Sequence, residues 1–275
     1  MEGKKKNLKI LILTLYYDRP KMVISGLNSI LNNNKTYENW ELIFVDDGSK
    51  ISGRPIVEKI LKDHLHKIRF YCIEDTVEQK LKQGGHRVGE FYNQAIKESD
   101  AEIVINLADD DVLYEDYLYN LNNWFNDHPE EPYSCSDLIW FDPGSEIASK
   151  NIIRDFGQNC TTRLRNRLER QQYGDGVTIE DMAWRIKCNK EGGIWFPYPD
   201  TVFLDSFKVN LWKKYGGPNN NRSTNFFACY KSITDNSLLR KIVSHGRPHK
   251  YNLETHYKMI DIIYSGDVNT NQYYE

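Results

Sequence analysis

Three consecutive aspartates, Asp109, Asp110 and Asp111, form the group in this sequence whose chemistry is easiest to infer. Neighbouring carboxylates repel one another unless a cation or solvent neutralises them. Mg²⁺ and Mn²⁺ prefer oxygen ligands, and they are often held by one or two carboxylates together with the phosphates of a substrate. The run therefore indicates a divalent-metal site for a diphosphate leaving group, with a solvated loop or the start of a helix as the structural alternative.

A second acidic cluster consists of Asp46 and Asp47, which a Gly-Ser pair follows directly. An aspartate at the end of a strand can hydrogen-bond a base or a ribose, while a turn with a helix cap is an equally good explanation. No G-x-G-x-x-G follows the first apolar segment, which argues against a nicotinamide or flavin enzyme. No G-x-x-x-x-G-K-S/T occurs either, which argues against a P-loop ATPase or kinase.

Both clusters stand at the ends of apolar segments, in a chain that alternates strand-like and helix-like patterns. The expected strands are residues 8–15, 41–45, 68–73, 102–107 and 133–141, and the expected helices contain residues 23–31, 57–61, 88–96 and 117–125. Asp18 is expected to cap the first helix, with Pro20 in its first turn. Such alternation predicts βαβ units and a mainly parallel sheet, in which ligands bind outside the carboxyl ends of the strands. Both clusters are therefore candidates for the site.

Composition limits the class of protein. The 275 residues carry a net charge of -3, with 40% hydrophobic and 27% charged residues, so we expect a soluble globular protein and not a strongly basic nucleic-acid binder. No apolar run reaches the roughly 20 residues that span a bilayer. The five cysteines include no C-x-x-C pair, which favours neither a disulfide framework nor a thiolate zinc site. The expected location is cytoplasmic, either free, peripheral at a membrane, or in a virus-infected host cell.

Four motifs, in this order, resemble those of glycosyltransferases of the GT-A fold, most closely the large inverting family 2. Residues 15–20 (LYYDRP) are similar to the family's first-strand motif, proline-threonine-tyrosine-asparagine-arginine-proline, and residues 45–49 (VDDGS) match its second motif. Residues 89–96 resemble the segment before the metal motif, and residues 107–111 (LADDD) resemble the metal motif itself. The resemblance implies an α/β, Rossmann-like GT-A fold with a mainly parallel central sheet, helices on both faces and a C-terminal acceptor-side extension.

The resemblance also implies a nucleoside diphosphate sugar as donor, with UDP as the expected nucleotide, and Mn²⁺ or Mg²⁺ as cofactor. The residues that it assigns to nucleotide-sugar binding are Leu15, Tyr16, Tyr17, Arg19, Asp46, Asp47, Asn93, Asp109 and Asp110, with Asp109 directed to the ribose. The expected metal ligands are Asp110 and Asp111, with His256 as a further candidate. Tyr16, Tyr92 and Ala108 depart from the threonine, arginine and aspartate that the family usually has there.

Two aspartates compete for the role of general base, which the family places in an acidic motif ahead of an arginine. Asp235 follows the Gly216-Gly217 turn and precedes Arg240, in the order that the family shows. Asp181 lies in a literal Glu-Asp pair ahead of Arg185, but it precedes that turn. The order of motifs favours Asp235, which is preferred, and the local sequence favours Asp181. For both, a helix N-terminal carboxylate is the structural alternative.

The chain is expected to form one domain. Residues 8–141 are assigned to a nucleotide-sugar-binding half, residues 142–266 to an acceptor-binding and catalytic-base half, and residues 267–275 to a polar tail of the single domain 1–275. The expected function is metal-dependent, inverting transfer of a hexose or pentose to a hydroxyl of a glycan, a lipid, a protein or a modified DNA base. The alternatives are a nucleotidyltransferase and a degenerate, non-catalytic protein that binds a sugar nucleotide or a glycan.

Overall fold

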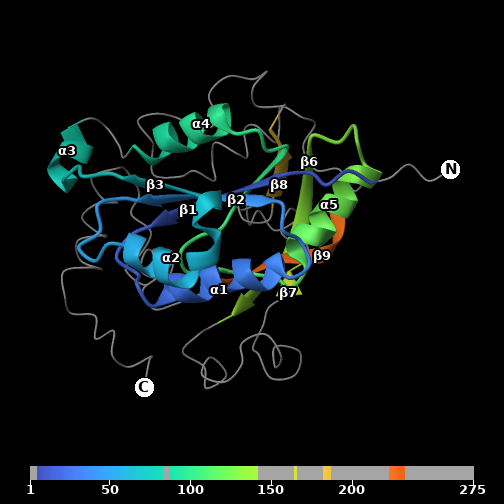
Figure 1. Ribbon diagram of the computed structural model, residues 1–275, viewed down its shortest axis with the longest axis horizontal. Coiled ribbons are helices and arrows are strands. Elements are labelled where there is room, and N and C mark those ends of the chain that lie inside the picture. Colours follow the sequence, from blue (N-terminus) through green and yellow to red (C-terminus); the bar gives the residue numbers. More distant parts are fainter. Residues whose placement is uncertain (1–4, 83–86, 142–163, 166–181, 187–222, 233–275) are drawn as a thin grey trace.

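The computed structural model describes residues 5–82, 87–141, 164–165, 182–186 and 223–232, whose strands belong to a single sheet (Figure 1). In chain order the elements are β1 (Ile10–Tyr16), α1 (Met22–Asn34), β2 (Trp40–Asp46), α2 (Arg54–Ile60), a 3₁₀ helix (Lys62–Lys67), β3 (Ile68–Cys72), α3 (Val77–Lys82), α4 (Val88–Glu98), β4 (Ile103–Asn106), β5 (Val112–Leu113), α5 (Tyr117–Asp127), β6 (Tyr133–Phe141), β7 (Leu164–Arg165), β8 (Met182–Arg185) and β9 (Ser223–Ser232). All strands and helices expected up to residue 141 are present. None of the described helices combines the length and the apolar character needed to cross a membrane.

The described strands are arranged in the order β3-β2-β1-β4-β8-β6-β9-β5, with β7 paired to β6. β1 lies parallel between β2 and β4, and β3 lies parallel to β2. Beyond β4 the sheet is mixed, because β8 is antiparallel to both β4 and β6, whereas β9 is parallel to β6 and antiparallel to β5. The predicted parallel arrangement is therefore confirmed for β1 to β4, the part of the sheet that carries both acidic clusters.

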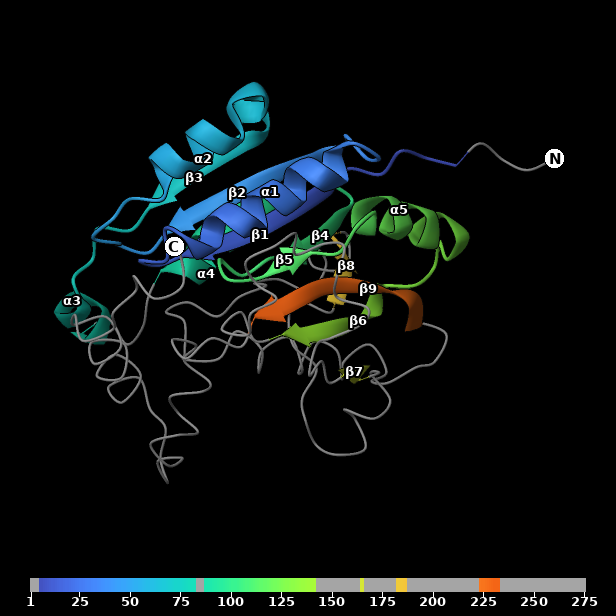
Figure 2. The same cartoon turned by 90° about the horizontal axis from the view of Figure 1, so that it is seen from below.

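Helices cover both faces of the sheet, as expected, with α1 and α2 on one side and α4 on the other (Figure 1), and Figure 2 looks onto the face that α1 covers. Ile10 and Ile12 of β1 belong to a core cluster with α1, α2 and α5. Leu11 and Leu13 belong to a second cluster with α4. Because successive side chains of a strand point to opposite faces, a strand covered on both sides needs apolar residues at nearly every position.

The turn from β1 into α1 differs from the prediction. The helix begins at Met22 with Lys21 at its N-cap, and no side chain caps it, so the expected cap by Asp18 is wrong. Asp18 instead has a left-handed backbone conformation, with a φ of 48°, which aspartate tolerates better than most residues. Its carboxylate accepts a hydrogen bond of 3.0 Å from the Ile51 N–H. Asp18 therefore joins the turn after β1 to the loop after β2, and Pro20 lies in the turn before the helix.

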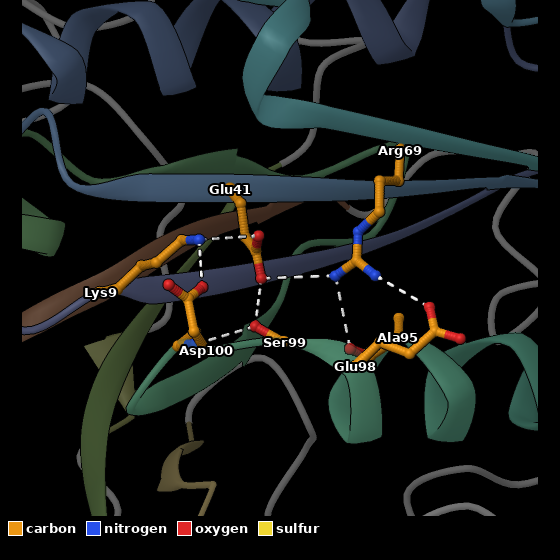
Figure 3. A network of polar contacts seen from close by, with 8 residues as sticks. Lys9, Glu41, Arg69, Ala95, Glu98, Ser99 and Asp100 are labelled. Atoms are coloured by element: carbon orange, nitrogen blue, oxygen red, sulfur yellow. Dashed lines mark hydrogen bonds and ion pairs between the residues drawn. The ribbon is translucent and has the colours of Figure 1, made fainter.

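At the amino edge of the parallel strands, charged side chains pair with one another (Figure 3). Glu41 of β2 contacts Lys9, with 3.1 Å between Nζ and Oε2, and Arg69 of β3, with 3.4 Å between Nη2 and Oε1. Lys9 also pairs with Asp100, and Arg69 with Glu98 at the end of α4. These charges neutralise one another within the protein and fasten the end of α4 to the starts of three strands.

Candidate active site at the carboxyl edge of the sheet

Three segments meet at the carboxyl edge of the parallel strands: the turn after β1, the loop after β2 and the acidic run after β4. Tyr16 of β1 lies opposite Asp46 of β2 in the strand register, and the Asp47 N–H donates to the Tyr16 carbonyl oxygen (3.0 Å). On the other side of β1, the Leu107 N–H donates to the Leu13 carbonyl oxygen (2.9 Å). Both acidic clusters therefore lie at one edge of the sheet and flank the turn that follows β1.

Arg19 joins the first of these segments to the last. Its Nη1 atom lies 2.9 Å from Asp109 Oδ1 and 2.8 Å from Asp110 Oδ2. The side chains of Arg19, Asp109 and Asp110 are only 17%, 8% and 11% exposed. The second oxygen of Asp109 accepts a hydrogen bond of 3.0 Å from the Tyr17 N–H. One cationic nitrogen thus neutralises two carboxylates at a single point.

Burial dominates the acidity of Asp109. It raises the pKa of this carboxyl to about 6, and the nearby Asp110 charge acts in the same direction. The Arg19 guanidinium and the hydrogen bond from the Tyr17 N–H lower the pKa, but they do not outweigh the removal of the carboxylate from water. More positive charge at this place would lower the pKa of Asp109 and stabilise its ionised form.

The three aspartates of the run differ in burial. Asp111 is completely buried (0% exposed) and Asp109 is 6% exposed, which leaves Asp110 as the most accessible of the three. Within the described residues, no three His, Cys, Asp or Glu side chains form a group that could hold a metal ion. A metal would therefore depend on one or two carboxylates and on substrate phosphates, as is common for Mg²⁺. The assignment of Asp110 and Asp111 to the metal stays a prediction, and His256 lies outside the described residues.

The loop after β2 is shaped around Asp46. Its Oδ1 accepts a hydrogen bond of 2.9 Å from the Ser49 N–H and its Oδ2 accepts one of 3.0 Å from the Gly53 N–H, while the residue is 5% exposed. Gly48 has a φ of 78°, and a Cβ added there would lie 2.8 Å from the Ile73 carbonyl oxygen, so glycine is required. Asp46 therefore organises this loop, and its contact with a nucleotide stays a prediction.

The backbone of Tyr16 lies at the carboxyl edge of the sheet, but its ring lies in the core. The ring is completely buried (0% exposed), stacks on Phe44 with 5.5 Å between the ring centroids, and donates from its hydroxyl to the Ile51 carbonyl oxygen (2.8 Å). Leu15 packs on the opposite face, against the cluster with α4, and Asn93 is half-buried on α4 itself. A contact between the Tyr16 ring and a nucleotide would require the ring to leave the core.

Sequence analysis did not single out Asn106, a buried polar residue beside the site. It is 5% exposed, and in the described part of the chain neither its Oδ1 nor its Nδ2 atom has a hydrogen-bond partner. Asn106 ends β4, three residues before Asp109. The sequence feature that could have identified Asn106 is its carboxamide within the otherwise apolar segment 103–107 (IVINL).

Asp181 and Asp235 both lie outside the described residues, but the strands next to them are described. β8 begins at Met182 and runs antiparallel to β4, so its beginning is directed to the carboxyl edge. β9 ends two residues after Tyr230, which pairs with Val112, the residue that follows the acidic run. The described ends of both strands lie on the side of the acidic run, and both candidates for the general base stay open.

The model of one protein family, described as glycosyl transferase family 2, matches residues 11–185 of the chain. The chain is also 26% identical over 144 residues to the poly(ribitol-phosphate) beta-N-acetylglucosaminyltransferase TarP of Staphylococcus aureus strain N315. That match covers 52% of this chain and 39% of TarP, so the chain spans well under half the length of this relative.

Two solved structures of S. aureus TarS share the fold. The crystal structure of TarS 1–349 has a TM-score of 0.54 at 19% identity, and the match covers 82% of this chain and 60% of the TarS chain. The crystal structure of TarS 1–349 in complex with UDP-GlcNAc has a TM-score of 0.53 at 16% identity, and the match covers 93% of this chain and 65% of the other. At these identities the likeness establishes the fold alone, and it confirms the expected α/β architecture.

Proposed function

The chain belongs to glycosyl transferase family 2, and from this premise we propose that it moves a sugar from a UDP-sugar to an acceptor hydroxyl with inversion at the anomeric carbon. The observation that carries the proposal is the pair of largely enclosed carboxylates, Asp109 and Asp110, that share one cationic nitrogen of Arg19 at the carboxyl edge of the sheet. The names of the relatives support the choice of donor. A TarS crystal contains UDP-GlcNAc, so UDP-N-acetylglucosamine is the first donor to test.

Mn²⁺ or Mg²⁺ fits the residues at this edge. Carboxylate oxygens are the ligands that both ions prefer, and the contact of Arg19 Nη1 with Asp110 Oδ2 (2.8 Å) shows that a positive charge can lie against this carboxylate. When bound, the metal supplies neutralisation of the charge that grows on the leaving diphosphate. Asp110 and Asp111, with His256, are the proposed ligands, while Asp109 is directed to the ribose.

The proton of the acceptor hydroxyl needs a general base, for which Asp235 and Asp181 remain the two proposals. The base removes this proton as the hydroxyl oxygen attacks the anomeric carbon and the bond to the diphosphate breaks. A single displacement of this kind inverts the configuration of that carbon. The match to the family ends at residue 185 and so includes Asp181 but not Asp235, which supports Asp181 against the order of motifs that favours Asp235.

The acceptor is proposed to be a hydroxyl of a glycan or of a polyol phosphate polymer. The support is the name of TarP, a poly(ribitol-phosphate) transferase, which shares 26% identity over half of this chain. Lipid, protein and modified DNA hydroxyls are the other acceptor classes consistent with the resemblance. A protein that only binds a sugar nucleotide would show the same donor site without turnover.

Calorimetric titration of UDP into the purified protein, with and without Mn²⁺, tests the donor site. We expect UDP binding that requires Mn²⁺ and is lost in Asp110→Ala. The matched control is Asp127→Ala, because Asp127 is an exposed aspartate that pairs with Lys5 on another part of the molecule. Folded wild-type protein that binds no nucleoside diphosphate would disprove the donor assignment, and metal-dependent UDP binding without UDP-GlcNAc turnover on any polyol phosphate or glycan would favour the non-catalytic alternative.

A further inference from the structure

One face of α1 carries Gly26, Ser29 and Asn33, residues three and four positions apart that lie on the same side of the helix. All three are buried. Buried helix faces are mostly apolar, so two polar side chains and a glycine at this place call for a structural reason. Their contacts supply it, because they reach the backbone that directly follows Asp111.

The Ser29 hydroxyl takes part in two hydrogen bonds. It donates to the Gly26 carbonyl oxygen (2.6 Å) and accepts from the Leu113 N–H (3.0 Å). Leu113 stands two residues beyond Asp111, and Ser29 is 2% exposed. Removal of the hydroxyl would leave the Leu113 N–H buried without this acceptor, so Ser29 fixes the backbone of β5 to the helix.

Asn33 extends the same attachment by one helical turn. Its Nδ2 donates to the Tyr114 carbonyl oxygen (3.0 Å) and its Oδ1 accepts from the Leu118 N–H (3.0 Å), with Asn33 itself 1% exposed. The Leu118 N–H lies in the first turn of α5, where backbone donors have no partner within their own helix. One carboxamide therefore holds both the residue after β5 and the start of α5.

The segment between these attachments has little room to move. A Cβ added to Gly26 would lie 2.9 Å from the Asp111 carbonyl oxygen, so the helix and the acidic run are in direct contact. On the other side β5 pairs with β9, and the Tyr114 N–H donates to the Ala228 carbonyl oxygen (2.9 Å). Residues 111–114 are thus enclosed between α1 and β9.

We infer that Ser29 and Asn33 are positioning residues for the donor site: through the backbone of residues 113–118 they set where Asp110 and Asp111, the proposed metal ligands, stand for the metal-bound diphosphate. The inference rests on the proposed function and adds to it residues that lie outside all the motifs assigned to donor binding. Neither side chain has to touch the metal. Groups that hydrogen-bond a metal ligand directly alter metal affinity by about 10- to 100-fold, and Ser29 and Asn33, which act through the backbone that follows Asp111, are expected to have a smaller effect.

Mn²⁺ in the presence of UDP is the probe, and free Mn²⁺ is measured by its electron paramagnetic resonance signal. The variants are Ser29→Ala, Asn33→Ala and Gly26→Ala. The matched control is Asn122→Ala, because Asn122 is also buried (7% exposed) and accepts a hydrogen bond of 3.0 Å from the Leu8 N–H, before the start of β1. Melting temperatures are recorded for all proteins.

Ser29→Ala and Asn33→Ala are expected to raise the Mn²⁺ dissociation constant by up to about tenfold, the lower end of the effect of a direct partner of a metal ligand. Ser29→Ala, Asn33→Ala and Asn122→Ala are expected to lower the melting temperature by similar amounts, because each removes a buried hydrogen bond. Asn122→Ala alone is expected to leave the Mn²⁺ affinity unchanged. Gly26→Ala keeps both side-chain hydrogen bonds but displaces the Asp111 carbonyl, so it also weakens Mn²⁺ binding. This variant provides the test if an alanine at Ser29 or Asn33 prevents folding.

Equal Mn²⁺ affinity in the wild type and the α1 variants, while Asp110→Ala abolishes binding, would overturn the inference and leave the proposed function intact. The absence of UDP-dependent Mn²⁺ uptake in the wild type would instead overturn the metal site of the proposed function, and the inference with it.

Discussion

Arg19 links the turn after β1 to the acidic run after β4 by ion pairs. Its Nη1 atom contacts one oxygen of Asp109 and one of Asp110, and the pKa of Asp109 is still raised, because burial outweighs the guanidinium. Arg19 therefore acts as an internal counter-ion for the two carboxylates. A divalent cation bound to Asp110 would compete with the guanidinium for this carboxylate, and the displaced guanidinium could pair with a diphosphate, for which its geometry is suited.

Arg19→Gln should separate metal binding from nucleotide binding. Without nucleotide, we expect Mn²⁺ to bind about tenfold more tightly than in the wild type, a gain of ~1.4 kcal/mol, because the competing charge is gone. Affinity for UDP in saturating Mn²⁺ should fall, because a cationic partner of the diphosphate is lost. Both quantities can be measured by calorimetry, with Arg54→Gln as control, since Arg54 pairs with Glu58 at the surface. Weaker Mn²⁺ binding by Arg19→Gln would show that the guanidinium supports the metal rather than competing with it.

The sequence was sufficient to predict that the two acidic clusters lie at one edge of the sheet, because each follows an apolar strand of a parallel sheet. It could not show that the Tyr16 ring turns into the core. β1 is apolar on both faces, so its pattern does not reveal which side chains meet solvent at its end. It also could not show that the Asp46 oxygens both accept backbone hydrogen bonds, since a turn and a ligand contact require the same residue types.

At the scale of elements, Arg185 of β8 closes the end of α5. Its Nη2 donates to the carbonyl oxygens of Phe125 (2.6 Å) and His128 (3.0 Å), and its Nε donates to that of Glu131 (2.9 Å). The last carbonyls of a helix lack partners within the helix and carry partial negative charge, which favours a cation there. Arg185, which the sequence analysis considered as the arginine of an acidic motif, therefore has a structural role: it joins β8 to α5.

Arg185→Met should lower the free energy of unfolding by about 3 kcal/mol, because it keeps much of the aliphatic stem but leaves one buried and two partly buried carbonyls without a charged donor. Urea denaturation measures the change. Arg69→Met serves as control, because Arg69 is a partly exposed arginine with ion pairs of 3.4 Å, and we expect a cost below about 1 kcal/mol there. Similar losses in both variants would contradict the capping role of Arg185.

Tyr37 ties the region after α1 to the start of β1. Its hydroxyl contacts the Leu8 carbonyl oxygen and lies 3.2 Å from Asn122 Oδ1. Burial raises the pKa of Tyr37 above its ordinary value of 10.0, and the Glu102 charge acts in the same direction. The folded protein therefore holds this proton more tightly than the unfolded chain. The stability that depends on it is complete below about pH 10 and is lost as the pH rises toward the folded pKa.

Tyr37→Phe should therefore be less stable than the wild type at pH 8, by about 1 kcal/mol from the lost hydrogen bonds. Between pH 9 and pH 11 it should lose less stability than the wild type, because phenylalanine has no proton to release. Urea unfolding at several pH values tests both statements. Parallel pH profiles for the two proteins would mean that Tyr37 does not contribute to the alkaline loss.

Three elements near the site were not predicted, and each for a definable reason. β5 has two residues, too few for any periodic pattern. β8 and β9 pair with strands that are distant in sequence, so their burial depends on partners that local patterns do not reveal. The positioning role of Ser29 and Asn33 was hidden in the same way, because their partners lie 84 and 85 residues away.

On the scale of the whole molecule, the two halves expected from the sequence share one sheet. β8 pairs with β4 and β6, and β9 pairs with β6 and, directly after the acidic run, with β5. The choice between the two proposed bases depends on how the second half approaches this edge. Asp181→Asn and Asp235→Asn replace each carboxylate by an isosteric amide. The variant that loses the base should lose about 10²- to 10⁴-fold in kcat, with UDP affinity unchanged, while the other stays near the wild type. Turnover near the wild-type level in both variants would exclude both assignments.

β9 lies between β6 and β5 in the sheet, although both strands precede it in the chain. During synthesis, when N-terminal segments emerge first, β1 to β4 and α1 can associate while β5 and β6 still lack the strand that joins them. Pairings between distant segments form slowly compared with local ones. A nascent chain must therefore keep two strand edges open until β9 arrives, and such edges invite pairing with other chains. The topology thus makes the chain most prone to wrong pairing during its synthesis, in the interval between the translation of β6 and that of β9.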